Sequence, residues 1–353
     1  MSISAPVALE GNGHVRHLVW FHTAFLGDLI LATAGMELAA KTFSQVSQWL
    51  ITTPLGAKAL GGLPYLRGIY AINKRTNPFT TARGIREFLG NNLGDSWTDS
   101  GILIQAHRSH RSSLVALGIG MKRVTYRQTA WNIGAIAKVD RLLLFHEAQR
   151  IAMLLEAFGT SRVQTLQARP KLYPRYWRGQ GEWRYLDGAV GLAPGSQWGT
   201  KRWPKESFKV LVGNILSKKD AKVVLLGSQD EVSLAEDIQS SYQRDSRLMS
   251  LVGKTQVDDL PDIVAQLSAL VSNDSAFVHY GSALDIPTVA LFGPTVPAMG
   301  FAPLAPKSQA LGIDLSCRPC SLHGPEICPK GHFRCMKNLS PDLVGQVLQE
   351  IIP

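Results

Sequence analysis

Short apolar runs alternate with segments of helical periodicity along most of this chain, and the alternation lapses once, between residues 164 and 186. Strands that alternate with helices predict a parallel sheet covered by helices, because parallel neighbours need a crossover between them. The lapse contains Pro170, Pro174, Gly179 and Gly181, which is typical of a linker. The sequence therefore predicts two α/β domains, and a length of 353 residues agrees with that number.

The expected elements fall on both sides of this linker. Before it, the expected strands are residues 17–22, 49–53, 68–73, 101–107 and 123–126, and the expected helices are residues 27–41, 80–93, 111–118 and 145–158. After it, the expected strands are residues 190–193, 222–227, 248–251, 269–272 and 288–292, and the expected helices are residues 205–216, 231–242, 259–267, 275–284 and 342–351. The expected bounds are a disordered lead-in at 1–15, domains at 16–178 and 179–340, and a terminal helix at 341–353. Two such domains normally enclose a cleft, with ligands at the carboxyl ends of the strands.

Composition excludes several classes of protein. Hydrophobic residues make up 45% and charged residues 18% of the chain, which is typical of a folded protein and argues against disorder. Four cysteines are too few for a disulfide scaffold, and no apolar run approaches the roughly 18–20 residues of a membrane span. The first residues lack the basic start and apolar core of a signal peptide, so we expect a cytoplasmic protein with reduced thiols.

The positive charge lies in one half of the chain. Residues 1–180 hold 21 Lys+Arg and 9 Asp+Glu, whereas residues 181–353 hold 16 and 18, and together they give the formal net charge of +10. A one-sided field attracts an anion, such as nucleic acid, an anionic membrane face or a phosphorylated substrate, and solubility alone is the alternative.

The first motif, residues 23–28 (Thr-Ala-Phe-Leu-Gly-Asp), follows the first expected strand and opens the first expected helix. Gly27 permits a tight turn, and Asp28 stands at the helix N-terminus on the edge where ligands bind. An acidic residue there is also common for stability alone, since it contributes about 1 kcal/mol to a helix. The functional alternative is a general base at the rim of the cleft.

The second motif, residues 193–204, follows a strand and precedes a helix whose first position suits Pro204. It combines small residues, the hydroxyls of Ser196 and Thr200, and the adjacent cations Lys201 and Arg202. Backbone N–H groups and a lysine charge are what a diphosphate needs. The pattern is not a Walker A loop, and a solvated basic loop is the alternative.

The third motif, residues 272–279, ends a strand in Asn-Asp-Ser and starts a helix, where Asp274 or Ser275 can cap the N-terminus. Ser275 and His279 are four residues apart and share a helical face. A lone histidine on such a face is more often a core residue than a ligand. Residues 287–295 then end a strand in Gly-Pro-Thr and return small polar residues to the same rim.

Three segments in this order carry a resemblance to a known family. They are Phe-His-Thr-Ala-Phe-Leu-Gly-Asp at 21–28, Pro-Gly-Ser to Thr-Lys-Arg-Trp-Pro at 194–204, and Asn-Asp-Ser to Phe-Gly-Pro-Thr at 273–295. The chain resembles glycosyltransferase family 9, the lipopolysaccharide heptosyltransferases, over roughly residues 16–345, and most closely the heptosyltransferase II type. The resemblance implies the GT-B fold, with two Rossmann-like domains facing each other across a cleft, the acceptor on the first and the nucleotide sugar on the second.

The resemblance also implies an activity and residue roles. Members transfer heptose from ADP-heptose to the inner core of lipopolysaccharide with inversion, here onto a lipid A-Kdo-heptose acceptor. Asp28 matches the proposed base, and Lys201 matches the phosphate-binding lysine with Ser196 and Thr200 beside it. The other donor positions are Asp274 near the sugar, Ser275 at the diphosphate, Ala276, where many members have glycine, and His279.

Other assignments rest on position alone. The expected nucleotide contacts are Gly227, Ser228, Glu231 and Thr255, and the expected acceptor contacts are His22, Thr23, Arg67, Arg108 and Arg111. The basic half coincides with the acceptor domain, so we expect its cations to meet an anionic acceptor at the inner face of the cytoplasmic membrane. The cations considered for this role are Arg67, Arg83, Arg86, Arg108, Arg111, Lys122 and Arg123.

All four cysteines, Cys317, Cys320, Cys328 and Cys335, lie within 19 residues. Four thiolates at such spacing can form a tetrahedral zinc or iron site, with His323 and His332 as spare ligands. The alternatives are reduced thiols that pack the loop, or a redox role. Similar loops in relatives include some suggested to bind metal and others without it.

We expect no cofactor in the chemistry itself, because no carboxylate pair forms an obvious catalytic metal site. Two other functions remain open at this point: another GT-B transferase or epimerase that uses a UDP- or GDP-sugar, and a basic nucleic-acid-binding protein. Against the latter, no known basic and aromatic module is present, and we expect no nucleic-acid partner.

Overall fold

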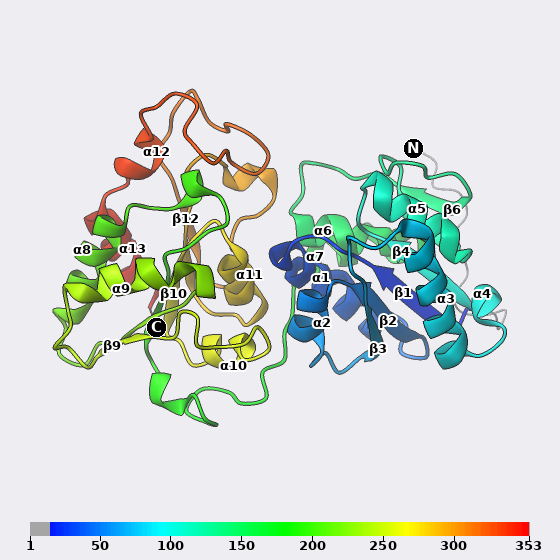
Figure 1. Cartoon of the computed structure of the whole chain (residues 1–353), viewed down its shortest axis with the longest axis horizontal. Coiled ribbons are helices and arrows are strands. Elements are labelled where there is room, and N and C mark those ends of the chain that lie inside the picture. Colours follow the sequence, from blue (N-terminus) through cyan, green and yellow to red (C-terminus); the bar gives the residue numbers. More distant parts are fainter. Residues whose placement is uncertain (1–14, 353) are drawn as a thin grey trace. The chain divides into compact units, whose positions relative to one another are not determined.

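The computed structural model describes residues 15–352, and the chain divides into two compact units, Met1–Lys171 and Leu172–Pro353. Each unit contains one parallel sheet covered by helices (Figure 1). The division falls earlier in the linker than the expected boundary between residues 178 and 179. Residues 1–14 of the expected lead-in lie outside the described residues.

The first unit holds a six-stranded sheet in the order β3-β2-β1-β4-β5-β6 with parallel pairing throughout. Its strands are β1 (His17–Phe21), β2 (Ser47–Thr52), β3 (Leu66–Ala71), β4 (Gly101–Gln105), β5 (Lys122–Tyr126) and β6 (Ala135–Val139). Its helices are α1 (Leu26–Thr42), α2 (Pro54–Leu60), α3 (Pro78–Leu93), α4 (Trp97–Ser100), α5 (His110–Ile119), α6 (Glu147–Ala152) and α7 (Arg162–Gln167).

Helices cover both faces of this sheet, which explains why β1 is a continuous apolar run. Val19 and Phe21 pack in one cluster with side chains of α3 and α5. Trp20 points to the other face, where a Cβ placed on Gly35 of α1 would lie 2.9 Å from its ring. The Trp20 indole donates a hydrogen bond of 2.7 Å to Gln48 Oε1, so its one polar atom is satisfied within the core.

The second unit repeats the architecture, with strand order β12-β11-β10-β7-β8-β9. Its strands are β7 (Val190–Ala193), β8 (Val223–Leu225), β9 (Leu248–Ser250), β10 (Ala269–Asn273), β11 (Thr288–Leu291) and β12 (Gln309–Leu311). Its helices are α8 (Lys205–Leu216), α9 (Val232–Ser240), α10 (Leu260–Val264), α11 (Ala276–Ala283), α12 (Arg334–Lys337) and α13 (Pro341–Ile351).

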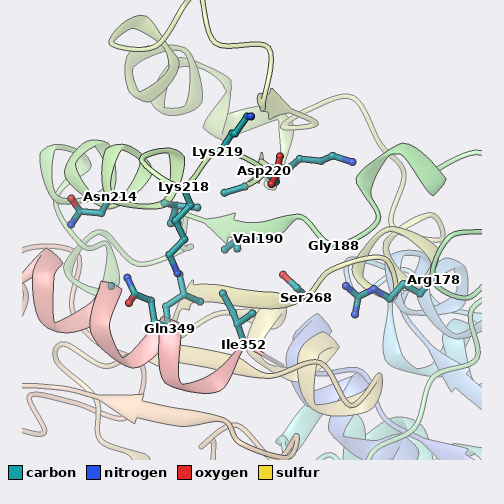
Figure 2. A pocket seen from close by; sticks show the side chains of 15 residues that line it. Arg178, Gly188, Val190, Asn214, Lys218, Lys219, Asp220, Ser268, Gln349 and Ile352 are labelled. Atoms are coloured by element: carbon teal, nitrogen blue, oxygen red, sulfur yellow. The ribbon is translucent and has the colours of Figure 1, made fainter.

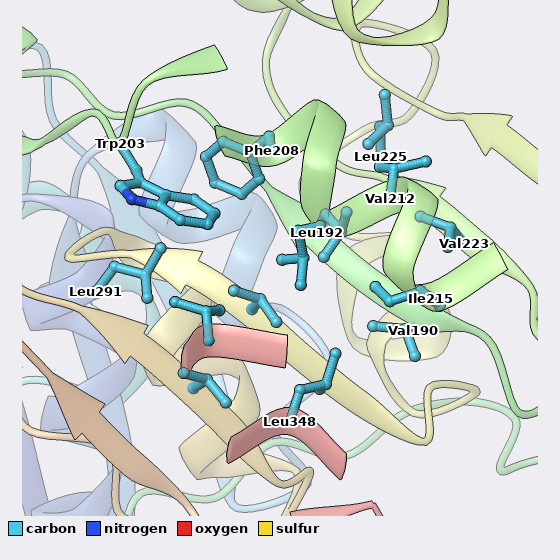
Figure 3. Packing of buried hydrophobic residues seen from close by; sticks show 14 of the residues in the cluster. Val190, Leu192, Trp203, Phe208, Val212, Ile215, Val223, Leu225, Leu291 and Leu348 are labelled. Carbon is cyan, nitrogen blue, oxygen red and sulfur yellow. The ribbon is translucent and has the colours of Figure 1, made fainter. Parts of the chain in front are cut away.

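The core of the second unit is anchored by Trp203, the last residue before Pro204 (Figure 3). Its ring meets Phe208 of α8 edge to face at 4.9 Å, and its indole donates to Leu339 O at 3.0 Å. The Trp203 amide donates to Asn273 Oδ1 at 3.0 Å. Trp203 therefore fixes the end of the second motif to the core, and the residues from Pro194 to Arg202 form the loop that precedes it.

Each strand order reverses at one point. In the first sheet β1 lies between β2 and β4, and in the second sheet β7 lies between β8 and β10. At such a switch point the following loops lead to opposite faces, which opens a crevice at the carboxyl ends of the strands. The loops after β1 and β4, and those after β7 and β10, are therefore where each unit can bind a ligand.

The structure departs from the expected elements in a few places. The edge strands β6 and β12 and the short helices α2, α4, α7 and α12 were not anticipated. The helix expected over 145–158 is α6 followed by a 3₁₀ segment, Met153–Phe158. The expected terminal helix is α13. Across residues 15–352, none of the helices combines the length and apolar character needed to cross a bilayer.

Candidate functional site

In the first unit, β1 delivers two buried polar residues to the switch point. His22 and Thr23 follow β1 directly and are both buried. Phe25 is the N-cap of α1, and Asp28 lies in the first turn of that helix. Asp28 is partly exposed, so its carboxylate can meet a ligand at this edge.

His107, two residues beyond β4, completes a polar cluster with these residues. Its Nδ1 lies 3.0 Å from Thr23 Oγ1 and 2.8 Å from Ser112 Oγ, and its ring meets that of His22 edge to face at 6.0 Å. Ser109, the N-cap of α5, donates to Ser112 Oγ at 2.9 Å. The loops after β1 and β4 are thus joined by side-chain hydrogen bonds at the switch point.

Burial makes both imidazoles weak bases. Burial lowers the pKa of His22 to about 3, to which the His107 ring adds, while the Asp28 backbone acts in the opposite direction. Burial together with Lys74 and Arg108 lowers the pKa of His107 to about 4. Both rings are therefore neutral at physiological pH and add no positive charge beside the Asp28 carboxylate.

Lys74, from the loop after β3, is a further residue of this edge. Its electrostatic interaction with Asp28 raises its pKa, although burial has the larger effect and lowers it overall. Neither Lys74 nor His107 lies in one of the three sequence motifs. The signal that could have found them is position, because each lies at the carboxyl end of an expected strand, 68–73 for Lys74 and 101–107 for His107.

The expected acceptor cations do not all reach this edge. Arg108 and Arg111 lie in the segment after β4, where Arg111 donates to Thr76 O. Arg67 lies at the amino end of β3, about 13 Å of strand before its carboxyl end, so the structure does not bring it to Asp28. Arg123 is buried and donates to Gln105 Oε1 at 3.1 Å and to Ile133 O at 2.8 Å, so it serves the core rather than a ligand.

In the second unit, an ion pair joins the loops after β7 and β10. Lys201 Nζ lies 2.6 Å from Asp274 Oδ2, and the two side chains are only 12% and 9% exposed. The Thr295 hydroxyl, from the loop after β11, donates to the same oxygen at 2.6 Å. Three loops of the switch-point region therefore converge on one carboxylate.

The rest of the second motif is held in place by backbone contacts. Asn273 Nδ2 donates to Pro194 O at 2.7 Å, and Arg202 Nε donates to Ser196 O at 2.8 Å. Ser196 is buried, as is Thr200, whose hydroxyl donates to Pro325 O. Asn273 and Thr295 were quoted in the motifs but not proposed as site residues, because their role depends on loops that meet only in the folded chain.

The third motif begins α11 as expected. Ser275 is the N-cap, and its Oγ accepts from Phe277 N at 3.3 Å and lies 3.0 Å from Ser272 Oγ. Ala276 is the first residue of the helix, and the buried His279 follows one turn later, with its ring 6.1 Å from that of Phe301. The positive end of α11 therefore lies beside Lys201 and Asp274, where it favours an anion.

Three of the expected nucleotide contacts also reach this edge. The Glu231 carboxylate lies against the second motif, since a Cβ on Gly195 would be 1.7 Å from its Oε1. It also accepts from Ser228 N at 2.7 Å and lies against Gly227. Thr255 follows Gly253, whose amide donates to Gly227 O at 3.2 Å, so it lies in the adjoining loop.

The cysteine cluster does not take the arrangement of a metal site. Within the described part of the chain, no three His, Cys, Asp or Glu side chains are grouped so that they could hold a metal ion. Cys317 Sγ lies 3.9 Å from His332 Nε2, and Cys335 is buried. The structure thus lends no support to the zinc or iron site expected at Cys317, Cys320, Cys328 and Cys335.

A cavity of about 470 Å³ lies elsewhere in the second unit (Figure 2). Val190, Lys222 and Ser268 line it from the amino ends of β7, β8 and β10. It is therefore at the edge of the sheet opposite Lys201 and Asp274, and it is not part of the candidate donor site.

Comparison with known proteins agrees with these motifs. The model of "Glycosyltransferase family 9 (heptosyltransferase)" matches residues 142–326, which is just over half of the chain. Lipooligosaccharide heptosyltransferase 2 of Campylobacter jejuni is 29% identical over 168 residues, which are 46% of this chain and 50% of that protein. The chain thus spans about half the length of the first curated relatives that it matches.

Solved structures share the fold over nearly the whole chain. The ADP-heptose lipopolysaccharide heptosyltransferase II of Escherichia coli matches with a TM-score of 0.76 at 20% identity and covers 96% of this chain and 98% of that one. A family 9 glycosyl transferase from Veillonella parvula matches with a TM-score of 0.78 at 20% identity, covering 98% and 99%. The expected GT-B class of fold, two Rossmann-like α/β domains, is confirmed.

Proposed function

Because the chain belongs to glycosyltransferase family 9, the heptosyltransferases, we propose that it transfers heptose from ADP-heptose to the inner-core oligosaccharide of lipopolysaccharide, with inversion at the anomeric carbon. The observation that carries this proposal is the buried Lys201–Asp274 pair beside the N-terminus of α11. A lysine, two serines and a helix N-terminus at a switch point are what a nucleoside diphosphate requires. The Escherichia coli protein with the same fold is an ADP-heptose lipopolysaccharide heptosyltransferase, which supports the choice of donor.

In this proposal the second unit holds the donor. Lys201, Ser196 and Thr200 bind the diphosphate with the N-terminal amides of α11 behind Ser275. The Lys201 ammonium is now paired with Asp274 at 2.6 Å, so a diphosphate that binds there competes with that carboxylate for the same cation. Glu231 lies against Gly195 and Gly227, and in this proposal its carboxylate accepts hydrogen bonds from the nucleoside.

The first unit supplies the base. Asp28 removes the proton of the acceptor hydroxyl as that oxygen forms its bond to the anomeric carbon and the bond from that carbon to the diphosphate breaks. The transition state is oxocarbenium-like, and ADP leaves with the negative charge that Lys201 and the α11 N-terminus stabilise. His22 and His107 are neutral and orient the loops around Asp28. Every step uses groups of the chain and its two substrates.

The acceptor is an anionic saccharide anchored to lipid, so the chain acts as a peripheral protein at the inner face of the cytoplasmic membrane. Lys74, Arg108 and Arg111 lie at the same sheet edge as Asp28 and are suited to the phosphates and acidic sugars of such an acceptor.

A nucleotide comparison tests the proposal. ADP should raise the melting temperature of the chain, whereas UDP and GDP at the same concentration should have much smaller effects, because only a bound ligand stabilises the fold. Incubation with ADP-heptose and a heptosyl acceptor should then give a product with the opposite anomeric configuration by NMR. Stabilisation by UDP or GDP alone would favour another GT-B transferase or epimerase and contradict the proposal.

A further inference from the structure

Two leucines between β6 and α6 are unusually exposed for a folded domain. Leu143 is 68% exposed and Leu144 is 87% exposed, the highest value for a large hydrophobic side chain in the part of the chain described. They lie at the tip of a turn at residues 142–145, in which Phe145 N donates to Leu142 O at 3.3 Å. Contiguous exposed apolar side chains mark interaction surfaces, whereas single exposed apolar residues are common and need no such role.

A buried arginine holds the backbone of this turn through hydrogen bonds. Arg150 of α6, whose side chain is only 2% exposed, donates from Nε to Leu142 O at 3.1 Å and also donates to Leu143 O. The same guanidinium pairs with Glu147 at 2.8 Å. The leucines are therefore presented to solvent by a buried hydrogen-bond network and do not project from a loose loop.

The sheet edge that carries the turn is strongly basic. The segments that follow the six strands of this sheet are residues 22–28, 53–55, 72–79, 106–111, 127–134 and 140–146. Together with Glu147, the first residue of α6, they contain six cations and three carboxylates, namely Lys74, Arg75, Arg108, Arg111, Arg127 and Arg141 against Asp28, Asp140 and Glu147. Arg127 pairs with Asp140 and Arg141 pairs with Glu147, which leaves Lys74, Arg75 and Arg108 as exposed cations of this edge. The helix-to-strand segments 43–46, 61–65, 94–100 and 120–121, at the opposite edge, contain Asp95 and Asp99 and no lysine or arginine. Arg16, Arg67 and Lys122, at the amino ends of β1, β3 and β5, add three cations to that opposite edge, so its positive excess is smaller than that of the edge with the turn.

Other apolar side chains are exposed at the same edge. Phe25, Leu55 and Phe79 lie at the starts of the helices that follow β1, β2 and β3, and Phe79 is 70% exposed. Trp131, in the segment after β5, packs its ring 6.0 Å from His110 at the start of α5 and is partly exposed. Exposed apolar and aromatic side chains among Lys and Arg are the composition of a surface that binds an anionic bilayer.

We propose that this edge of the first unit seats the chain on an anionic lipid bilayer, with Leu143 and Leu144 entering the headgroup region and the exposed cations Lys74, Arg75 and Arg108 meeting lipid phosphates. The choice of a membrane as the partner rests on the proposed function, in which the acceptor is anchored to lipid. This placement on lipid also assigns the exposed turn a role, because the edge that meets the lipid is the edge that presents Asp28 to the acceptor.

Vesicle binding of the full chain tests this surface. Wild-type protein should float with vesicles of phosphatidylglycerol and phosphatidylcholine, and bind vesicles of phosphatidylcholine alone far more weakly. Leu143→Ser with Leu144→Ser should reduce partitioning into the anionic vesicles by at least about tenfold, since burying even one leucine contributes that much. A matched double variant, Leu117→Ser with Val163→Ser, removes two exposed apolar side chains outside this edge and should bind as wild type does.

The outcomes separate this inference from the proposed function. Unchanged vesicle binding of the Leu143/Leu144 variant, an equal loss in the Leu117/Val163 variant, or a change in oligomeric state in place of a change in vesicle binding would overturn the inference. Melting temperature and ADP affinity, measured on each variant, establish that the protein is folded. Failure of wild type to use ADP-heptose would remove the proposed function, whereas leucine-dependent vesicle binding would still establish the surface.

Discussion

Lys201 Nζ lies 2.6 Å from Asp274 Oδ2, and these two side chains come from the loops after β7 and β10, neighbouring strands at the switch point of the second sheet. The pair is nearly buried, and Thr295 donates to the same carboxylate oxygen. It therefore joins the second and third sequence motifs in one site, and it makes the charge on Lys201 important for stability as well as for binding.

Replacing Lys201 should separate these two roles. Lys201→Met leaves Asp274 buried without its cation and should lower the free energy of unfolding by about 3 kcal/mol in urea denaturation. Lys201→Met with Asp274→Asn should recover most of that stability, but ADP affinity should stay low because the diphosphate has lost its lysine. Lys205→Met, which breaks the exposed pair with Asp237, is the matched control and should change either quantity little. Full recovery of ADP affinity in the double variant would contradict the assignment.

The buried imidazoles predict a fall in stability in mild acid. The pKa values of His22 and His107 are lowered to about 3 and about 4, so both rings stay neutral in the folded chain as pH falls below 6.5, where unfolded histidines gain protons. The unfolded state then binds more protons, and the free energy of unfolding should fall by about 2 kcal/mol between pH 6 and pH 5 from this pair. This loss of stability is absent well above pH 6.5, where the histidines are neutral in both the folded and the unfolded states.

Urea denaturation at several pH values measures this effect. His107→Asn should remove about half of the decrease, whereas His110→Asn, at an exposed histidine of the same unit, should leave it unchanged. A pH dependence that is the same in His107→Asn as in wild type would show that the ring is not held neutral in the fold.

The positions of Arg108 and Arg67 on the first sheet predict which of them contributes to acceptor binding. Arg108→Ser should raise the acceptor KM several-fold and leave ADP affinity unchanged, because Arg108 lies at the edge that carries Asp28. Arg67→Ser should change neither quantity, since Arg67 is exposed at the amino end of β3. Steady-state kinetics at saturating donor distinguish the two, and equal effects would mean that the positive charge acts only through solubility.

The four thiols should differ in reactivity. Burial raises the pKa of the Cys328 thiol, but hydrogen bonds from the backbone amides of residues 330–333 outweigh burial and hold that pKa below its usual value. For Cys320 and Cys335, burial is the largest effect and raises the pKa. Iodoacetamide at neutral pH should therefore label Cys328 first, because the thiolate is the nucleophile. Mass spectrometry of timed samples measures the order. Equal protection of all four, together with stoichiometric metal by elemental analysis, would restore the metal site.

The parts of the fold that were predictable are those with a strong local pattern. Buried strands such as β1 are continuous apolar runs, and the motif loops follow from where those runs end. The edge strand β6 alternates exposed and partly buried residues, and β12 has only three residues, so neither gives a clear signal.

The site was predictable only where its residues lie within motifs. Asp28, Lys201 and Asp274 stand in recognisable segments, whereas His107 gains its role from Thr23, 84 residues away in sequence. Arg123 reads as a surface cation in the sequence, but its carbonyl partners at Trp131 and Ile133 appear only when the segment after β5 folds back over the sheet. Long-range partners of this kind are set by topology and have no local signature.

The most direct test of the account is single-turnover transfer from ADP-heptose by Asp28→Asn. The substitution keeps the shape of the side chain but removes the base, so the rate should fall by at least about a hundredfold while ADP affinity, which depends on the second unit, stays at the wild-type value. Asp95→Asn, at an exposed carboxylate near the opposite edge of the same sheet, should transfer at the wild-type rate. A near-normal rate in Asp28→Asn would contradict the central claim that Asp28 deprotonates the acceptor.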